Sequence, residues 1–310
     1  MRSTTSCPAN SGVCVNWHAK RTAMSRHAHP SPHLIRDLVA RALAEDLSSG
    51  DVTTQSLFDA PVSAVGTILA EEPEGLVAAG LAVAVEVFAQ VDPALECTPL
   101  LVDGDRAACG TPVLTVHGDG RSILKGERVA LNFLQRLSGI ATLTATFCEA
   151  VKGARTQIAD TRKTTPGLRG LEKWAVTLGG GRNHRQSLAD GILIKDNHLA
   201  LAGGDVARAC RVARERAPHG LKIEVEARTL DEVRGALDGS ADIILLDNMD
   251  VATIRQAVAL IKGRALVEVS GGVTLANVHE IAAAGPDLIA IGALTHSAPA
   301  ANLSMDIVAR

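Results

Sequence analysis

Aromatic residues are scarce in this sequence, and it carries no strong charge of either sign. The 310 residues include two Trp, four Phe and no Tyr, and 31 Lys and Arg stand against 34 Asp and Glu, a formal net charge of −3. Proteins that bind nucleic acid typically present a basic surface or aromatic side chains on which bases stack. The composition therefore argues against a nucleic-acid partner.

Long apolar runs and paired cysteine motifs are missing as well. The longest apolar run, Leu76–Val85, has ten residues, whereas a membrane-spanning helix needs about 20, so we expect no membrane association. The six cysteines form no CxxC pair and show no metal-ligand spacing. Unpaired cysteines are typical of proteins in a reducing compartment, where thiols stay free, which predicts a cytoplasmic location.

The first half of the chain contains two unlike segments. Residues 1–30 are rich in Ser, Thr, Asn, Pro and His without helical or strand periodicity, and we expect a disordered extension there. After Pro32 an apolar stripe predicts a helix, and residues 63–70 and 111–117 are predicted as strands. A long amphipathic helix follows, with one face formed by Ile123, Ala130, Leu134, Leu137 and Ala141. These features predict a mixed α and β unit.

After about residue 155, short apolar runs alternate with helical stretches such as 205–217 and 231–237. Thr229 and Glu232 predict a capping box on the second of these helices. Six apolar runs are predicted as strands: 157–160, 192–195, 221–226, 242–247, 265–270 and 288–292. Alternating strands and helices indicate parallel βα units. We favour a barrel related to the (β/α)8 type over a doubly wound sheet.

Charged side chains follow almost every predicted strand, as at Asp160, Lys195, Glu224, Asp247 and Glu268. In parallel barrels these carboxyl ends form the mouth where active sites lie. Residues 160–198 contain seven Lys and Arg against four Asp and Glu, and arginine forks suit carboxylate or phosphate. Gly179-Gly180-Gly181 precedes Arg182, and we expect these glycines to let the backbone and the arginines approach a ligand closely. A buried salt-bridge network and a solvated charged face are the structural alternatives, but the pattern favours a polyanionic substrate.

Glycines mark the last two predicted βα loops, at Ser270-Gly271-Gly272 and from Gly292 to His296. Barrels often hold a phosphate in these loops through backbone N–H groups. Central carboxylates facing an anionic ligand could hold Mg²⁺ or stabilise a cationic transition state. Lys195 at a strand end leaves a Schiff-base lyase open as a different reaction class.

These motifs together resemble the quinolinate phosphoribosyltransferase family. The most specific match is the block Thr161–Arg169, and the resemblance covers nearly everything from about residue 31 to 308 in order. Departures are small: Trp174 stands where the family often has Tyr, and Ser187 where it often has Gly. Further matching motifs are Gly126-Glu127-Arg128, Gly179–Arg185, Leu193–His198, Glu224-Val225-Glu226, Leu246-Asp247-Asn248 and Ser270-Gly271-Gly272.

The resemblance implies an α/β fold with an N-terminal α/β sandwich domain over residues 31–140 and an open βα barrel over 141–295. A C-terminal segment, 296–310, would return to the N-terminal domain. The implied reaction is Mg²⁺-dependent transfer of phosphoribosyl from phosphoribosyl pyrophosphate to quinolinate, with decarboxylation. Its products are nicotinate mononucleotide, pyrophosphate and CO₂, in the biosynthesis of NAD.

The resemblance also implies roles for single residues. Quinolinate would contact Thr161, Arg162, His184 and Arg185, and the 5-phosphate would contact Ser270, Gly271, Gly272, Gly292 and His296. The catalytic residues would be Lys163, Lys195, Glu224 and Asp247, and the last two would also face the metal. The family is dimeric or larger, so a homodimer or hexamer is implied, with Arg128 crossing from the neighbouring subunit.

Two further alternatives stay open. A paralogous phosphoribosyltransferase could act on another pyridine or azole acid, although Arg162, His184 and Arg185 favour a dicarboxylate. The other alternative is a non-catalytic ligand sensor, and the full set of acidic residues argues against it.

Overall fold

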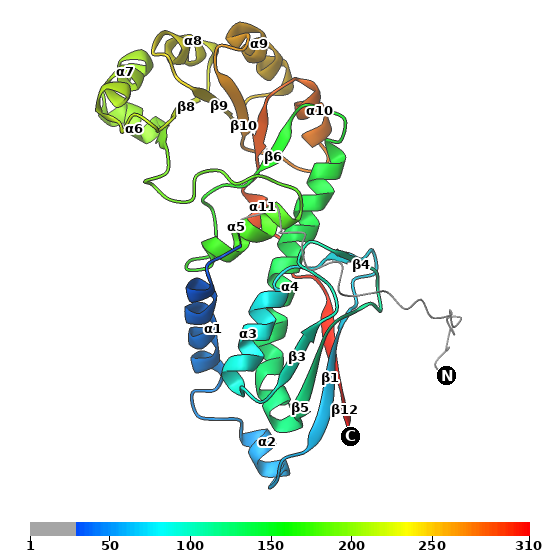
Figure 1. The fold of residues 1–310 in the computed structure, drawn as a ribbon. Coiled ribbons are helices and arrows are strands. Elements are labelled where there is room, and N and C mark those ends of the chain that lie inside the picture. The colour runs from blue at the N-terminus through cyan, green and yellow to red at the C-terminus, as the bar shows by residue number, and fades with distance from the viewer. Residues whose placement is uncertain (1–28) are drawn as a thin grey trace.

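A computed structural model describes residues 29–310 (Figure 1), so the extension expected over residues 1–30 lies almost wholly outside the described residues. The helices in the described range are α1 (Pro32–Asp46), α2 (Val52–Leu57), α3 (Leu81–Val91), α4 (Gly120–Ala150), α5 (Arg169–Leu178), α6 (Asp196–Leu201), α7 (Val206–Arg216), α8 (Leu230–Asp238), α9 (Val251–Ile261), α10 (Val278–Ala283) and α11 (Ala293–His296). None of them combines the length and the apolar character that crossing a bilayer requires. The strands are β1 (Ser63–Ala70), β2 (Leu76–Val77), β3 (Glu96–Pro99), β4 (Arg106–Ala107), β5 (Pro112–Asp119), β6 (Gln157–Ala159), β7 (Ile192–Ile194), β8 (Ile223–Ala227), β9 (Ile243–Asp247), β10 (Leu266–Ser270), β11 (Leu288–Ala290) and β12 (Leu303–Ala309).

An antiparallel sheet with helices packed against it forms the first part of the molecule (Figure 1). Its strand order is β12-β1-β5-β3. Every second residue of β1 is buried, the pattern of a strand with one covered face, and a Cβ placed on Gly66 would meet Ile123 of α4. The strands predicted at 63–70 and 111–117 are therefore confirmed as β1 and β5.

The predicted long helix is α4, and its five expected core positions are all buried. With 31 residues at about 1.5 Å each, it is roughly 46 Å long, and it packs on the antiparallel sheet and on α5. A Cβ on Gly139 would lie 2.0 Å from the Pro299 carbonyl oxygen. Only glycine permits this contact, which brings the segment between α11 and β12 against α4.

The second part is a parallel sheet curved into an open barrel, with the strand order β6-β11-β10-β9-β8-β7. The order follows the chain from β7 to β11, and β11 then pairs with β6. A doubly wound sheet would reverse direction at a switch point, so the barrel prediction is confirmed. The ring is open between β6 and β7, where Arg182 forms a single parallel bridge to Ala159.

All six predicted barrel strands are present, with ends that differ from the prediction by at most two residues. The predicted helices at 205–217 and 231–237 are α7 and α8. The capping box of α8 is confirmed, because the Glu232 N–H donates to Thr229 Oγ1 at 3.2 Å and the Thr229 N–H donates to Glu232 Oε2 at 3.1 Å. Buried apolar runs with charged ends thus locate the elements well.

After α11 the chain leaves the barrel and returns to the first part. There β12 pairs antiparallel with β1, from Leu303 opposite Ala70 to Ala309 opposite Ala64. The Gln135 side chain on α4 donates to the Leu303 carbonyl at 2.9 Å. The chain end is therefore a structural strand of the sandwich rather than part of the barrel mouth.

Candidate active site

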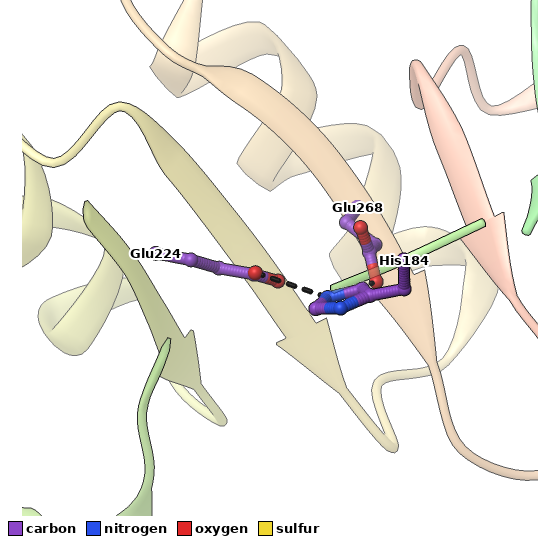
Figure 2. A group of neighbouring side chains, drawn as sticks. All are labelled: His184, Glu224 and Glu268. Carbon is purple, nitrogen blue, oxygen red and sulfur yellow. Dashed lines mark ion pairs between the residues drawn. The ribbon is translucent and has the colours of Figure 1, made fainter. Parts of the chain in front are cut away.

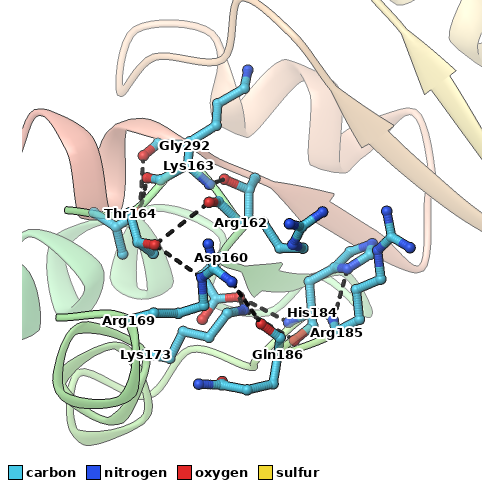
Figure 3. A network of polar contacts seen from close by, with 12 residues as sticks. Asp160, Arg162, Lys163, Thr164, Arg169, Lys173, His184, Arg185, Gln186 and Gly292 are labelled. Atoms are coloured by element: carbon cyan, nitrogen blue, oxygen red, sulfur yellow. Dashed lines mark hydrogen bonds and ion pairs between the residues drawn. The ribbon is translucent and has the colours of Figure 1, made fainter. Parts of the chain in front are cut away.

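The loops after β6 and β11 meet at the carboxyl end of the barrel (Figure 3). Thr295 Oγ1 donates to the Lys163 carbonyl at 2.8 Å. A Cβ on Gly292 would lie 3.0 Å from Lys163 Cδ and 3.1 Å from His296 Nε2. The structure therefore brings together Lys163, Gly292 and His296. Thr161 lies in the same loop, where its Oγ1 accepts from the Lys163 N–H at 3.0 Å.

The glycine loop after β10 packs against the end of β9. Gly271 has φ +91°, a left-handed conformation that favours glycine, and a Cβ there would lie 2.2 Å from Asn248 Oδ1. The Asn248 N–H donates to the Ser270 carbonyl at 2.9 Å. Ser270, Gly271 and Asp247 therefore lie in adjacent loops, and Asn248 joins them, although the sequence did not single it out as a site residue.

Two arginines of the predicted quinolinate pocket lack partners for part of their guanidinium groups. Arg162 Nε and Arg185 Nε are buried without a hydrogen-bond partner, while Arg185 Nη1 donates to the Gly191 carbonyl at 2.9 Å. Burial and the nearby Arg162 charge lower the pKa of Arg185. Like charges held close together are stabilised by an anion that accepts from both.

His184 lies between two buried glutamates on β8 and β10, the strands on either side of β9 (Figure 2). Its Nε2 is 3.0 Å from Glu224 Oε2 and 3.6 Å from Glu268 Oε1. The Arg185 N–H donates to His184 Nδ1 at 2.7 Å, so the neutral ring carries its proton on Nε2, which faces the carboxylates. Of this trio only Glu268 was not among the predicted site residues.

The electrostatics of this trio favour holding protons. Burial lowers the pKa of His184, but the hydrogen bond and charge of Glu224, together with Glu268, outweigh it and raise the pKa. Burial and the neighbouring Glu224 raise the pKa of Glu268 to about 8. The three side chains are close enough to hold a metal ion, but His184 Nε2 would first have to lose its proton because Nδ1 accepts the backbone N–H.

Asp247 belongs to a second, outer group of charges at the mouth. Arg228 donates to Asp247 Oδ2 at 3.3 Å and pairs with Asp196 at 2.7 Å. Lys195 Nζ lies 3.8 Å from Glu226 Oε2, and burial, followed by the charge of Asp247, raises the pKa of Glu226. Asp247 thus pairs in the outer group, whereas Glu224 pairs with His184 deeper in the barrel.

Among the predicted site residues, only Arg128 precedes the barrel strands. It is an exposed residue of α4. The α4 residue that reaches the loop after β11 is Arg136, which donates to the Thr295 and Ala298 carbonyls. Eight residues of helix separate Arg128 from Arg136, which amounts to roughly 12 Å.

The glycine run before Arg182 packs against the protein rather than opening towards a ligand. Cβ atoms on Gly179 and Gly181 would lie 2.7 and 2.8 Å from the Thr144 side chain of α4. The expectation that these glycines let backbone and arginines approach a ligand is therefore wrong for both. Their function is to seat the loop on α4, because a side chain at either position would collide with the helix.

A cavity of about 330 Å³ lies beside the His184 cluster, and its lining includes Arg185, Glu224 and Glu268. Its lining also includes the first residues of β7, β9 and β11, at Ile192, Ile243 and Leu288. The cavity therefore extends to the amino ends of the strands, away from the mouth where Lys163 and Gly292 meet.

The chain matches two family models that together span most of its length. The model described as "Quinolinate phosphoribosyl transferase, C-terminal domain" matches residues 140–306, and the corresponding N-terminal domain model matches residues 51–138. The two matches therefore cover both the antiparallel sheet with its helices and the barrel.

Similar proteins agree with these matches. The probable nicotinate-nucleotide pyrophosphorylase [carboxylating] of Bacillus subtilis is 41% identical over 273 residues, which cover 88% of this chain and 93% of that protein. A quinolinate phosphoribosyltransferase [decarboxylating] of Nicotiana tabacum is 42% identical, covering 90% and 84%. The crystal structure of NadC from Streptococcus pyogenes aligns with TM-score 0.86 and 41% identity, covering 91% of this chain and 99% of that one. This chain belongs to the quinolinate phosphoribosyltransferase family.

Proposed function

We propose that this protein transfers phosphoribosyl from phosphoribosyl pyrophosphate to quinolinate with decarboxylation, giving nicotinate mononucleotide, pyrophosphate and CO₂. The observation that carries the proposal is the pair of buried guanidinium Nε atoms of Arg162 and Arg185, both without a partner. A pyridine dicarboxylate offers acceptors for such groups. The names of the Bacillus and Nicotiana relatives support the same reaction.

Binding of quinolinate falls to Arg162 and Arg185, with Thr161 in the adjoining loop. His184 contributes in a specific way: its Nδ1 accepts the Arg185 N–H at 2.7 Å, and its Nε2 proton faces Glu224. The ring therefore orients the Arg185 backbone and lies beside the place proposed for the dicarboxylate. Lys163 and Lys195 at the rim supply positive charge for the pyrophosphate.

Transfer begins when the pyridine nitrogen attacks ribose C1 as the bond from C1 to pyrophosphate breaks. Positive charge develops on the sugar, and Glu224 and Asp247 are the carboxylates that stabilise it. The lysines Lys163 and Lys195 stabilise the negative charge that develops on the leaving pyrophosphate. The new ring cation then accepts the electron pair released when CO₂ leaves the neighbouring carbon, and that carbon takes up a proton.

The 5-phosphate is assigned to the loops after β10 and β11, at Ser270, Gly271, Gly272, Gly292 and His296. Both loops lie at the same mouth as Lys163. A Cβ on Gly292 would crowd the Lys163 side chain. Backbone N–H groups in glycine loops suit a phosphate because no side chain stands between them and its oxygens.

The acidic residues fit a magnesium ion. Glu224 Oε1 is buried without a hydrogen-bond partner, and Asp247 lies at the mouth with Glu226 nearby. Mg²⁺ is usually held by one or two carboxylates together with substrate phosphate oxygens, so Glu224 and Asp247 are the proposed ligands. The ion would supply positive charge to the pyrophosphate as it leaves.

The active form is proposed to be a homodimer or hexamer in which Arg128 reaches the site of a neighbouring subunit. Arg128 is exposed on α4, eight residues before Arg136, whose side chain donates to the loop after β11, and its exposed side chain is available to a neighbouring subunit. An additional cation is useful there because both substrates are polyanions.

A cytoplasmic location is proposed from the cysteines. Within residues 29–310 Cys97, Cys109, Cys148 and Cys210 are free, and burial raises the pKa of Cys97 to about 12. Free thiols are typical of reducing compartments. Three Nicotiana relatives carry "mitochondrial" in their names, so a fluorescent fusion of the full chain distinguishes the two locations.

The Schiff-base alternative is disfavoured by the surroundings of Lys195. Its side chain is half exposed, with Nζ 3.8 Å from Glu226 Oε2. Lysines that form Schiff bases are typically desolvated in an apolar pocket.

The test is chromatographic detection of nicotinate mononucleotide after incubation of the purified protein with quinolinate, phosphoribosyl pyrophosphate and Mg²⁺. Product should form only when all three are present, and nicotinate in place of quinolinate should give far less. Equal use of nicotinate would overturn the proposed substrate. No product from either acid would overturn the proposed reaction.

A further inference from the structure

Two consecutive residues of α5, Glu172 and Lys173, carry opposite charges into the protein interior. Glu172 is 0% exposed and Lys173 1% exposed. Successive residues of a helix point about 100° apart, so these two side chains reach different neighbours. Because an isolated buried charge is costly, each must be compensated by its own set of partners.

Lys173 reaches the segment that carries His184 and Arg185 (Figure 3). Its Nζ donates to Asp160 Oδ1 and, at 3.0 Å, to the His184 carbonyl. The His184 N–H in turn donates to Asp160 Oδ1 at 2.8 Å. With the Asn183 amide oriented so that its nitrogen faces these acceptors, the orientation that satisfies both amide atoms, it donates to Asp160 Oδ2 at 2.6 Å and to the Lys173 carbonyl at 2.8 Å. Both peptide groups of His184 are thus fixed by this one ion pair.

Glu172 reaches the opposite side, towards the loop after β11. Its Oε1 accepts from Arg136 Nη2 at 2.8 Å and from Thr165 Oγ1 at 2.7 Å. Arg136 also donates to the carbonyls of Thr295 and Ala298, the latter at 3.1 Å. Glu172 therefore holds Arg136, and Arg136 holds the turn that follows Gly292. Glu172 Oε2 also accepts the Thr165 N–H at 3.0 Å, which ties this turn to the end of the loop after β6.

We propose that Lys173 and Glu172 are positioning residues for different substrates: Lys173, with Asp160, fixes the quinolinate-binding segment, and Glu172, through Arg136, fixes the loop that binds the 5-phosphate. This inference rests on the proposed function, which assigns those two ligands to those two segments. Neither side chain is placed to touch a substrate, since both are buried beneath the segments they hold.

The test compares two variants that leave no unpaired buried charge, Asp160→Asn/Lys173→Gln and Glu172→Gln/Arg136→Gln. Steady-state KM values for both substrates are measured by formation of nicotinate mononucleotide. The first variant should raise the KM for quinolinate about tenfold and leave that for phosphoribosyl pyrophosphate within twofold. The second variant should raise the KM for phosphoribosyl pyrophosphate about tenfold and leave that for quinolinate within twofold. Each variant is the control for the other, because general loosening of the fold would move both KM values in both proteins.

A milder pair covers the case in which either double variant fails to fold, as judged by circular dichroism. Asn183→Ala removes two hydrogen bonds from the Lys173 side, and Thr165→Val removes the two that Thr165 Oγ1 makes with Glu172 and Arg136. Asn183→Ala should raise the KM for quinolinate about threefold, and Thr165→Val should raise the KM for phosphoribosyl pyrophosphate about threefold. Parallel changes in both KM values would overturn the inference. Absence of product with the wild-type protein would instead overturn the proposed function, so the two failures are distinguishable.

Discussion

At the scale of single residues, charge at the barrel mouth is arranged in two groups. Arg162 and Arg185 present buried Nε donors without partners, and Glu224 and Glu268, which flank His184, each present one buried oxygen without a partner. Buried polar atoms are rarely unpaired in a folded protein. The arginines therefore suit an anion, and the carboxylates suit a positively charged group.

Arg162→Ala should weaken use of quinolinate more than use of the sugar donor. Losing a charge-assisted hydrogen bond costs about 2 kcal/mol, or roughly thirtyfold in the KM for quinolinate. The KM for phosphoribosyl pyrophosphate should change by less than about threefold. Arg162→Lys serves as the matched control, since it keeps the charge but loses the bidentate fork. Equal effects on both substrates would show that Arg162 is misassigned.

Sequence reasoning located residues whose role depends on their place at a strand end, such as Arg162, Lys195 and Asp247. It missed Lys173 and Arg136, because nothing local to a helix reveals which distant segment its charged residues will hold. It noticed Glu268 only as one more charged strand end. The Gly179–Gly181 run was misread for a related reason: glycine signals close approach, but the sequence does not say whether a ligand or a helix approaches.

At the scale of elements, Asp242 joins strands β8 and β9 to helix α7. Its Oδ2 accepts from the Ile223 N–H at 2.7 Å and from Arg214 Nη2 at 2.6 Å. Burial raises the pKa of Asp242, but the Ile223 N–H and the Arg214 guanidinium outweigh it, so the pKa is held below its usual value. The carboxylate thus stabilises the folded state only while it is ionised.

The stabilising effect of Asp242 should depend on pH in one direction. Its pKa is lower in the folded state, so its contribution is present above the unfolded-state pKa near 4 and is lost as pH falls towards the folded-state pKa. Asp242→Asn should cost about 1 kcal/mol in the free energy of unfolding at pH 7, a modest value because the side chain is 34% exposed. Urea unfolding of both proteins at pH 7, 5 and 3.5 measures this. A difference that is the same at all three values would contradict the assignment.

Element positions were the most predictable feature of the chain. The barrel strands are short apolar runs with charged ends, and α4 has a clear apolar face, so local pattern and final structure agree. The pairing of β12 with β1 has no local signal, because it joins segments more than 200 residues apart; only the family resemblance indicated it. Likewise, the seating of the chain after α11 depends on Gly139, whose significance appears only with Pro299 beside it.

At the scale of the whole molecule, the proposed homodimer or hexamer places Arg128 of one chain at the site of a neighbouring chain. Random pairing of an Arg128→Ala chain with a Lys163→Ala chain would place one intact site in each mixed dimer. Because half of the dimers are mixed, activity should recover to about a quarter of the wild-type level. The assay is product formation after the two inactive proteins are co-refolded.

Mixing Lys163→Ala with Lys195→Ala is the control for that experiment. Both residues lie at the mouth of the same chain, so no pairing restores an intact site, and activity should stay at background. Recovery in the control, or none with Arg128→Ala, would argue against a site shared between subunits.

The central claim is that one barrel mouth couples sugar transfer to loss of the carboxylate next to the pyridine nitrogen. Release of ¹⁴CO₂ from quinolinate labelled in either carboxyl group tests it most directly. The account predicts that label adjacent to the nitrogen is released only when phosphoribosyl pyrophosphate is present, and that label in the other carboxyl group stays in nicotinate mononucleotide. Release without the sugar donor, or from the other carboxyl group, would contradict it.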